Sequence, residues 1–542
     1  MKKNDLCTII IHGYTAEGMG VGRTDDGMAV FVPGAAREDK LQVRLVKVLK
    51  NYAFGKIEEI LAPSPYRVEA DCPVFGKCGG CDFRHLTYEE ELWLKARRVH
   101  DAMTRIGGFD LPVPHVTGSP DIEGYRNKAQ FPVGLGENGM NYGFFRSRSH
   151  QLIPLEGCKL QSEEACALAE AVCRWADQCK VKPYNEAAHA GLLRHIYVRQ
   201  GRAGLHLTLV VLRDKLPRED LLVEICREAV PALCGIVVNV NPDRGNRVLG
   251  LSCRTLWGDE RLEDDLMGNT FRLSPLSFYQ VNHRQTENLY ACAARWASPD
   301  GDTEALDLYC GVGTITLTLA DHCKSVVGVE IVPAAIEDAK ENAARNGIEN
   351  ARFLCADAGQ AAAKMAAEGF RPGVIVVDPP RKGLDEAAVK ALCDMSPDRI
   401  VYVSCDCASL ARDAKMLFTQ GGYRPTKVQA FDMFPRTANI ETVVLLSKGE
   451  VDSKKIRVEF SLEDMDMSEF QDGATYPQIK AYVLEHSGLK VSNLYISQIK
   501  RKCGIEVGKN YNLPKSEDSR QPQCPPEKEK AIREAFKYFG MI

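Results

Sequence analysis

Residues 304–314 read EALDLYCGVGT, which joins a short apolar strand to a glycine-containing turn. Glycines at such a strand-to-helix turn let the backbone approach a ligand closely. In residues 276–448, further apolar stretches alternate with helical sequence. This alternation predicts an α/β fold with a parallel, doubly wound sheet. The expected strands are residues 304–308, 325–330, 351–355, 374–377, 400–403 and 442–446.

The chain of 542 residues is too long for one hydrophobic core, so several domains are expected. In residues 1–62, short strands separated by glycine turns predict a small, OB-like closed β-barrel. Residues 63–275 hold a cysteine cluster and then alternating strands and loops, which predict a central α+β domain. Residues 276–448 form the α/β domain. Residues 449–542 are expected to be a largely helical appendage of unknown role.

The composition is that of a soluble globular protein, with 45% hydrophobic and 26% charged residues. No apolar run reaches the length of a membrane span, and residues 1–5 lack the core of a secretion signal. We therefore expect a cytoplasmic protein with no membrane partner. The 20 cysteines are expected to be reduced thiols with a few metal ligands among them.

The net charge of −4 argues against bulk electrostatic binding to nucleic acid, but local basic surfaces remain possible. Residues 125–150 combine Arg126 and Lys128 with several aromatic side chains, which suit unstacked RNA bases. Residues 490–537 hold 11 Lys and Arg against 6 Asp and Glu. The alternative for either region is an ordinary solvated surface.

The turn after Asp307 does not carry the full dinucleotide fingerprint, because Thr316 stands where a third glycine is required. A ligand without a pyrophosphate therefore fits better. Glu330 ends the next strand, where a carboxylate can accept both ribose hydroxyls. These features favour S-adenosylmethionine as the cofactor.

Cys405 and Asp378 each follow a buried strand, and Glu441 borders another. Ligands of open α/β sheets bind beyond the carboxyl ends of the strands. A thiolate that adds to carbon 6 of uracil makes carbon 5 nucleophilic, and a base must later remove the carbon 5 proton. We therefore expect Cys405 to be a nucleophile of depressed pKa and Glu441 to be the base.

Several short sequence motifs of the α/β segment can be compared as a set with known protein families. They are residues 277–282, 307–313, 378–383, 404–405 with 410–413, and 432–435 leading to Glu441. The set resembles the RNA 5-methyluridine methyltransferases, and is most similar to the 23S ribosomal RNA uracil-5-methyltransferases. The resemblance covers nearly all of residues 1–448.

The resemblance implies an amino-terminal TRAM barrel, a central RNA-binding domain and a Rossmann-like methyltransferase domain. It implies that Cys405 is the nucleophile, that Glu441 is the base and that 23S ribosomal RNA is the substrate. Three positions depart from the usual family pattern: Thr314 replaces Asn, Asn439 replaces His, and Asp406-Cys407 replaces Asn-Pro. The implied contacts to the methyl donor are Gln280, Tyr309, Thr314, Glu330 and Asp378.

Cys72, Cys78 and Cys81 are closely spaced, and Cys158 follows much later. Four thiolates can hold either zinc or an iron–sulfur cluster, and the spacing alone does not separate these two. The family resemblance implies a 4Fe–4S cluster. We expect its role to be structural, because methyl transfer moves no net electrons.

Three alternatives remain. The first is a transfer RNA uracil-5-methyltransferase. The second is an amino-methyltransferase with an Asp-Pro-Pro-aromatic tetrad, which Arg381 disfavours because it stands where the aromatic is needed. The third is a non-catalytic RNA-binding or assembly factor, against which the presence of both Cys405 and Glu441 argues. No obligate protein partner is inferred.

Overall fold

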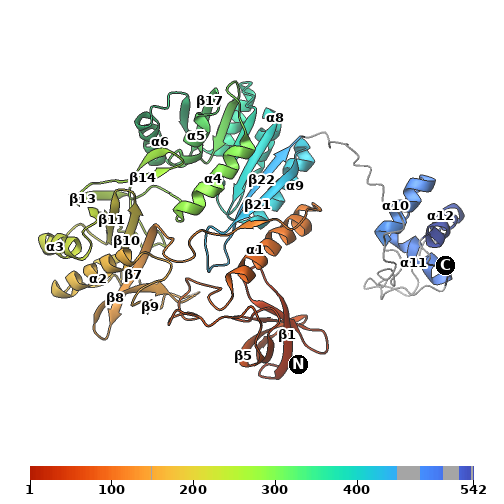
Figure 1. Ribbon diagram of the computed structural model, residues 1–542, viewed down its shortest axis with the longest axis horizontal. Helices are drawn as coiled ribbons and strands as arrows, with labels where there is room; N and C mark the ends of the chain where they lie inside the picture. Colours follow the sequence, from red (N-terminus) through yellow and green to blue (C-terminus); the bar gives the residue numbers. More distant parts are fainter. Residues whose placement is uncertain (148, 449–475, 504–523, 539–540, 542) are drawn as a thin grey trace. The chain divides into compact units, whose positions relative to one another are not determined.

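The computed structural model describes residues 1–147, 149–448, 476–503, 524–538 and 541. The chain divides into two compact units, Met1–Val451 and Asp452–Ile542 (Figure 1). The expected appendage of residues 449–542 therefore lies partly outside the described residues. None of the described helices combines the length and apolarity that a membrane crossing requires.

The first unit begins with a closed five-stranded barrel, which confirms the prediction for the amino-terminal segment. β1 pairs with both β2 and β4, so the sheet closes on itself. β2 was absent from the sequence prediction, since Gly20 and Gly22 carry no strand signal. A Cβ on Gly22 would lie 2.8 Å from Cδ1 of Ile9 and 3.0 Å from the carbonyl oxygen of Ile10, so this position has little room for a side chain. The strands are β1 (Leu6–Tyr14), β2 (Gly20–Arg23), β3 (Ala29–Val32), β4 (Lys40–Val48) and β5 (Tyr52–Ala62).

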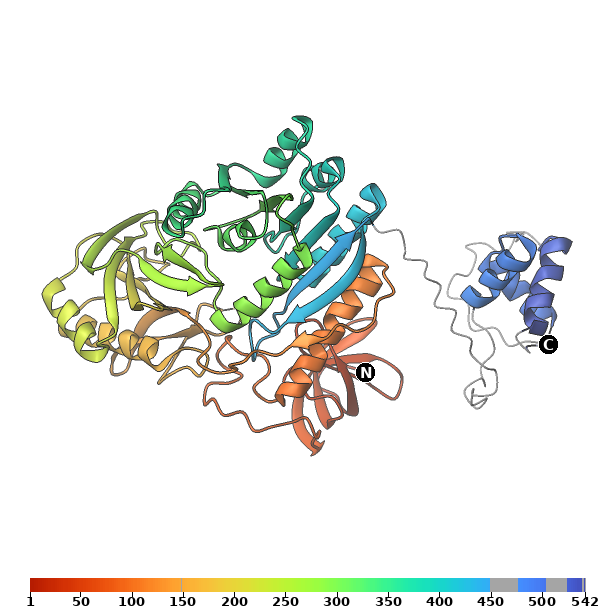
Figure 2. The ribbon, with the colours of Figure 1, turned by 45° about the horizontal axis from the view of Figure 1, so that its top comes forward.

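A seven-stranded sheet of order β13-β12-β11-β10-β7-β8-β9 follows the barrel. Its orange to yellow-green strands lie at the left in Figure 2. It is antiparallel, as predicted, except that β11 and β12 run parallel. Alternate residues of its strands form one core with α2 and α3, which contains the fully buried Trp175. The elements are β7 (Lys128–Gly136), β8 (Gly139–Phe145), β9 (Leu152–Pro154), α2 (Glu163–Gln178), β10 (Leu193–Gly201), β11 (Gly204–Val211), α3 (Glu219–Ala229), β12 (Leu233–Val240) and β13 (Ser252–Gly258), followed by the hairpin β14 (Leu262–Leu266) and β15 (Asn269–Leu273).

The third part of the first unit is an eight-stranded sheet of order β18-β17-β16-β19-β20-β22-β21-β6. The first five strands are parallel, but β22 runs antiparallel to both of its neighbours. The expectation of a wholly parallel sheet was therefore wrong at this edge, where a hairpin inserts β22 between β20 and β21. The strands are β6 (Val116–Thr117), β16 (Glu304–Leu308), β17 (Ser325–Glu330), β18 (Ala351–Cys355), β19 (Val374–Val377), β20 (Arg399–Ser404), β21 (Arg424–Phe431) and β22 (Glu441–Ser447), and the helices are α4 (His283–Ala297), α5 (Thr314–Ala320), α6 (Pro333–Arg345), α7 (Ala358–Ala367), α8 (Glu386–Met395) and α9 (Cys407–Gly421).

Helix α1 (Tyr88–Ala102) continues into a π-helical turn, Met103–Gly107, and connects the barrel to the eight-stranded sheet. Lys95 on α1 is fully buried. Its Nζ lies 2.8 Å from Oε1 of Glu91 and 2.6 Å from Oδ1 of Asp432. Asp432 begins the loop that leads into β22, so this ion network fixes the path of the chain toward Glu441.

The second unit contains α10 (Tyr476–Ser487), α11 (Asn493–Lys502) and α12 (Pro526–Tyr538), in agreement with the predicted helical appendage. The three helices share a small core that includes Ile479, Ile499 and Phe536. This core contains no residue of the first unit, so the second unit has a hydrophobic core of its own.

Candidate functional site

A cavity of about 600 Å³ opens at the carboxyl edge of the eight-stranded sheet. Side chains from the ends of β16, β17, β19, β20 and β22 meet there, as expected for an open α/β sheet. All seven residues that the sequence analysis assigned to the methyl donor and to catalysis line this one cavity. They are Gln280, Tyr309, Thr314, Glu330, Asp378, Cys405 and Glu441.

The turn from Tyr309 to Gly313 follows β16 and wraps one side of the cavity. Tyr309 and Gly311 have φ values of +72° and +56°, and the left-handed conformation is costly for a tyrosine. A Cβ on Gly311 would have no heavy atom within 4 Å, so the backbone here borders open space. Oε2 of Glu330 accepts a hydrogen bond of 3.3 Å from the Gly311 amide. This arrangement can cradle a ligand whose hydroxyls meet the Glu330 carboxylate.

The structure adds Asp357 and Tyr290 to the cavity lining, and the sequence analysis had missed both. Asp357 follows β18 at the same sheet edge and caps α7 by accepting a hydrogen bond from the Gln360 amide. Its position after a strand was a signal that could have identified it. Tyr290 lies on α4, and no local pattern distinguishes it from a core residue of an amphipathic helix.

Cys405 and Glu441 approach the cavity from adjacent antiparallel strands. Ser404 on β20 pairs with Thr442 on β22, so Cys405 comes directly after one partner and Glu441 directly before the other. Glu441 is buried, with an exposed fraction of 3%. Burial and the nearby Asp378 raise its pKa well above the usual value, while Arg381 lowers it.

Burial also raises the pKa of the Cys405 thiol, to about 11, with smaller contributions from Glu441 and Asp378. The structure therefore does not show the expected depressed pKa, because the thiol is buried and two carboxyl groups flank it. Arg381 acts in the opposite direction and lowers the pKa of Cys405. Its Nη2 donates a hydrogen bond of 3.3 Å to Oδ1 of Asn439, where the family pattern usually has His.

Two carboxyl groups at the strand ends have strongly raised pKa values. Burial raises the pKa of Asp378 to about 7. Burial likewise raises the pKa of Asp307 to about 7, although Thr316 opposes this by donating a 2.6 Å hydrogen bond to Oδ2. Perturbed pKa values of this kind are concentrated at functional sites.

Residues 410–413 stabilise the loop that carries Arg381. The buried Asp413 accepts hydrogen bonds of 2.7 Å from the Leu384 amide and from the Tyr402 hydroxyl. The departure at Asp406 preserves a helix cap, since this side chain accepts hydrogen bonds from the Ala408 and Ser409 amides at the start of α9. Hydrogen bonds at Tyr402 and Asp406 thus support the segment that carries Cys405 from both sides.

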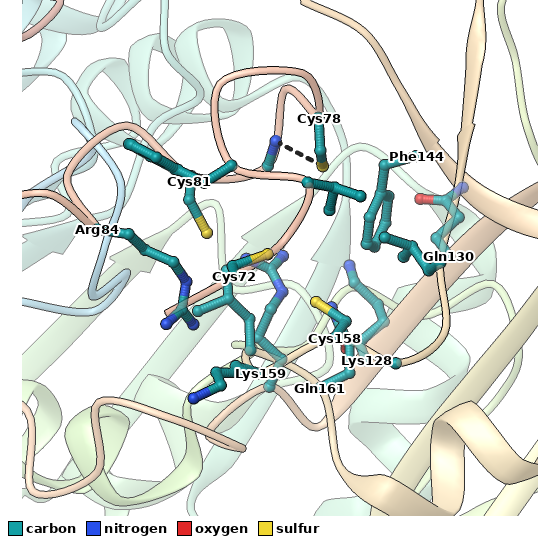
Figure 3. A pocket seen from close by; sticks show the side chains of 17 residues that line it. Cys72, Cys78, Cys81, Arg84, Lys128, Gln130, Phe144, Cys158, Lys159 and Gln161 are labelled. Atoms are coloured by element: carbon teal, nitrogen blue, oxygen red, sulfur yellow. Dashed lines mark hydrogen bonds between the residues drawn. The ribbon is translucent and has the colours of Figure 1, made fainter. Parts of the chain in front are cut away.

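Cys72, Cys78, Cys81 and Cys158 line a second cavity of about 330 Å³ (Figure 3). Every one of the 20 cysteines of the chain is a free thiol. Within the described ranges, no three His, Cys, Asp or Glu side chains stand close enough together to hold a metal ion. The four thiols therefore surround one space without converging on a single point.

Cationic side chains accompany these thiols, namely Arg84, Arg126, Lys128 and Lys159. Arg84 is largely buried and pairs with Asp71 at 2.7 Å and Glu123 at 3.0 Å. Its Nη2 has no hydrogen-bond partner among the described residues. Cys81 lies close enough for Arg84 to lower its thiol pKa, which burial nevertheless raises to about 12. The cavity thus combines soft ligands with positive charge.

Much of the aromatic stretch that the sequence analysis offered to RNA is core. Tyr125, Phe131 and Tyr142 are buried, and the Tyr125 hydroxyl donates a 3.1 Å hydrogen bond to the carbonyl of Pro435. Arg126 and Lys128 instead line the cysteine cavity. The sequence alone could not show which side chains of β7 and β8 face the core and which face the cavity.

Two family models match the chain. One, described as tRNA (uracil-5-)-methyltransferase, covers residues 259–449. The other, described as the TRAM domain, covers residues 4–57. The two matches cover most of the barrel and the strands β16 to β22 of the sheet that bears the cavity.

Curated relatives extend the likeness over the whole first unit. A protein of Halalkalibacterium halodurans named as an RNA methyltransferase is 43% identical over 449 residues, which are 82% of this chain and 98% of the relative. A Bacillus cereus protein with the same description is 42% identical over 453 residues, 83% of this chain and 98% of its own.

Among solved structures, the Pyrococcus abyssi tRNA (uracil-54, C5)-methyltransferase bound to S-adenosyl-L-homocysteine is similar with a TM-score of 0.65. It is 27% identical to this chain, and the match covers 81% of this chain and 99% of the Pyrococcus protein.

Proposed function

Because this chain belongs to the RNA (uracil-5-)-methyltransferase family and is a methyltransferase that uses S-adenosylmethionine, we propose that it methylates carbon 5 of a uridine in 23S ribosomal RNA through a covalent Cys405 adduct. The observation that carries the proposal is the single cavity, lined by Cys405, Glu441 and the residues offered to the methyl donor.

In the proposed reaction, Cys405 first loses its thiol proton to water. The thiolate sulfur then forms a bond to carbon 6 of the uracil, and the electrons of the double bond between carbons 5 and 6 move into an enolate, so that carbon 5 becomes nucleophilic. Carbon 5 then takes the methyl group from the sulfonium of the donor, which leaves as the neutral thioether. Glu441 accepts the proton from carbon 5, the bond between sulfur and carbon 6 breaks, and the Cys405 thiolate is regenerated. Electrons balance without an external oxidant or reductant.

The electrostatics of the site support this order of events. Burial raises the pKa of Cys405 to about 11, which favours the thiol over the thiolate. Arg381 favours the thiolate, and the positive charge of a bound sulfonium adds to this effect. The raised pKa of Glu441 makes this carboxylate a stronger base than an exposed glutamate.

We propose that Glu330 binds the ribose of the methyl donor and that Gln280, Tyr309, Thr314 and Asp378 complete its site. The open space beside Gly311 supports this assignment, because a ligand can lie against the turn without meeting a side chain. Asp357, which borders the same cavity, is available to the remaining polar atoms of the donor.

For the substrate, we propose that residues 1–62 and 63–275 act as the RNA-binding domains and residues 276–448 as the catalytic domain. The TRAM match supports RNA contact by the barrel. Transfer RNA is the second candidate, favoured by the substrate that the similar Pyrococcus enzyme is named for. With a ribosomal substrate, we expect the enzyme to act in the cytoplasm.

We further propose that Cys72, Cys78, Cys81 and Cys158 hold a 4Fe–4S cluster. Four thiolates suit such a cluster, which would tie residues 72–81 to Cys158 in the central domain. The surrounding Arg84, Arg126 and Lys128 support the assignment, since a thiolate-ligated cluster carries net negative charge. The unpartnered Nη2 of Arg84 is available to a sulfur acceptor.

The test uses full-length protein purified without oxygen and S-adenosylmethionine with a labelled methyl group. Unmodified 23S ribosomal RNA and transfer RNA are offered separately, and mass mapping locates the product. Methyl on uracil carbon 5 of the ribosomal RNA, absent with Cys405→Ala, is the expected result. Methyl in transfer RNA alone would replace the proposed substrate, and no transfer to either RNA would overturn the proposal.

A further inference from the structure

Tyr290 reaches the methyl-donor cavity from α4, a helix that carries none of the seven site residues expected from the sequence. α4 packs against α5 and against the strands β19, β20 and β22. Tyr290 is only 4% exposed, and its ring packs in the same apolar core as Leu289 and Ala293 of this helix. The side chain therefore has an apolar body in the core and a polar tip at the cavity.

The Tyr290 hydroxyl accepts a hydrogen bond but donates none. Thr314, the first residue of α5, donates from its Oγ1 to Oη of Tyr290 over 3.4 Å. This bond is longer than the usual O–H···O distance of about 2.7 to 2.8 Å, so both hydroxyls can turn toward a ligand at little cost. Within the part of the chain that the structure describes, the Tyr290 proton has no acceptor. Since buried polar groups are normally paired, a ligand in the cavity is the natural acceptor.

Thr314 stands where the family pattern usually has Asn. An Asn side chain offers an acceptor oxygen and a donor nitrogen, each one bond further from the backbone than a threonine hydroxyl. Thr314 alone therefore does not reproduce the hydrogen-bonding groups of Asn. With Tyr290 beside it, two hydroxyls from two different helices line this part of the cavity. The pair supplies the donor and acceptor capacity that the change at position 314 removes.

The order of the strands indicates which part of the methyl donor this pair meets. Glu330, proposed for the ribose, ends β17, whereas Cys405 and Glu441 lie at the ends of β20 and β22. β16 and β19 separate these two groups in the sheet. Thr314 follows the turn after β16, and Asp378 follows β19. With its ribose at Glu330 and its sulfonium toward Cys405, the donor has its amino-acid portion near Thr314 and Asp378.

The electrostatics around Tyr290 suit this portion. Burial raises the pKa of the Tyr290 hydroxyl and the nearby Asp378 adds to the rise, which favours the protonated, donating form. The amino-acid portion of S-adenosylmethionine carries a carboxylate, which accepts hydrogen bonds, and an ammonium group, which pairs with carboxylates. A neutral O–H donor beside the Asp378 carboxyl group can therefore serve both charged groups.

We propose that Tyr290 donates a hydrogen bond to the carboxylate of the methyl donor and, together with Thr314, takes over the role of the family Asn. The inference rests on the proposed function, because it concerns the same cavity and the same methyl donor. The two positions should depend on each other. The Tyr290 hydroxyl is required while position 314 is threonine, and it becomes dispensable when position 314 is asparagine.

The test measures binding of S-adenosyl-L-homocysteine to full-length protein by calorimetry, without RNA. Tyr290→Phe removes only the hydroxyl and should raise Kd about 10-fold, as expected for the loss of one hydrogen bond to a charged group. 5′-Methylthioadenosine lacks the amino-acid portion, so it should bind the variant and the wild type equally. In turnover, KM for S-adenosylmethionine should rise by a larger factor than kcat falls.

Tyr290→Phe/Thr314→Asn should recover an affinity within about threefold of the wild type, because the two positions act as one unit. Tyr423→Phe is the matched control. Tyr423 is also buried and donates a 2.8 Å hydrogen bond to the carbonyl of Pro397, but it does not line the cavity. This control should leave the Kd for S-adenosyl-L-homocysteine unchanged.

Three results would each overturn the inference: an unchanged Kd for Tyr290→Phe, an equal loss of affinity for both nucleosides, or no recovery with Thr314→Asn. Failure of the wild type to bind S-adenosyl-L-homocysteine would overturn the methyl-donor site and this inference together. Intact binding without methyl transfer to RNA would refute the proposed reaction alone.

Discussion

Cys405 and Glu441 are brought together by strand direction. Ser404 at the end of β20 pairs with Thr442 near the start of β22, and the two strands are antiparallel. The carboxyl end of β20 and the amino end of β22 therefore share one edge of the sheet. A pair 36 positions apart in sequence becomes adjacent because one strand is reversed.

This adjacency predicts that Glu441→Gln will trap the reaction after methyl transfer. Without the base, the carbon 5 proton stays in place and the Cys405 sulfur cannot leave. A protein–RNA complex that survives denaturing electrophoresis should accumulate and carry labelled methyl. Turnover should fall by about 100-fold or more.

Cys405→Ala and the double variant Cys405→Ala/Glu441→Gln are the controls, and neither should form the complex. A denaturation-resistant complex in either control would exclude Cys405 as the attachment point.

Arg381→Gln should move the acid limb of the kcat/KM profile to higher pH. The pKa of Cys405 is about 11 with the lowering effect of the guanidinium included, so loss of Arg381 raises this pKa further and leaves less thiolate at neutral pH. Each unit of pKa change corresponds to about tenfold in thiolate population. Arg381→Lys keeps the positive charge and should shift the profile less. Identical profiles for the wild type and Arg381→Gln would contradict this role.

Lys95→Ala should lower the free energy of unfolding of the first unit by about 3 to 5 kcal/mol. The substitution leaves Glu91 and Asp432 buried without the cation that both contact. Chemical denaturation measures the change. Arg97→Ala removes an exposed cation of the same helix and should cost no more than about 0.5 kcal/mol. Equal effects of the two substitutions would refute a stabilising ion network.

Asp378→Asn should stabilise the ligand-free protein increasingly as pH rises. Burial raises the pKa of Asp378 in the folded protein to about 7, while the unfolded chain has the ordinary value near 4. The wild-type protein therefore has its full stability below pH 4 and loses part of it as the pH rises through 7. Ionisation of Asp378 in the folded protein lowers the free energy of unfolding by at most about 4 kcal/mol, and solvent in the cavity reduces this loss. The difference in Tm between variant and wild type should grow from pH 5 to pH 8. A constant difference would show that Asp378 titrates normally.

Cys158→Ser should remove most of the iron from protein purified without oxygen, together with its visible absorbance. A cluster cannot be held firmly by the remaining three thiolates near residue 78. Cys355→Ser, at an exposed thiol remote from the set in sequence, should retain both signals. Iron content that is equal in the two variants would argue against the proposed ligand set.

The local sequence was sufficient for much of the fold. Strands 304–308, 325–330, 351–355 and 374–377 were predicted with the bounds that the structure has. Apolar runs between helical stretches are a local signal, and so are the acidic strand end at Glu330 and the turn at Gly311. β21 and the barrel strand β2 were missed, since neither combines apolar alternation with clear boundaries.

The sequence by itself determined most of the helices and strands, the α/β class and the set of reactive side chains, because these depend on composition and on the hydrophobic period along the chain. Only the tertiary structure decided the direction of β22, the burial of Tyr125 and Tyr142, and the raised pKa of Cys405. Each of these depends on long-range pairing and on exclusion of water. A thiol acquires its pKa from neighbours that are distant in sequence, and no local pattern specifies them.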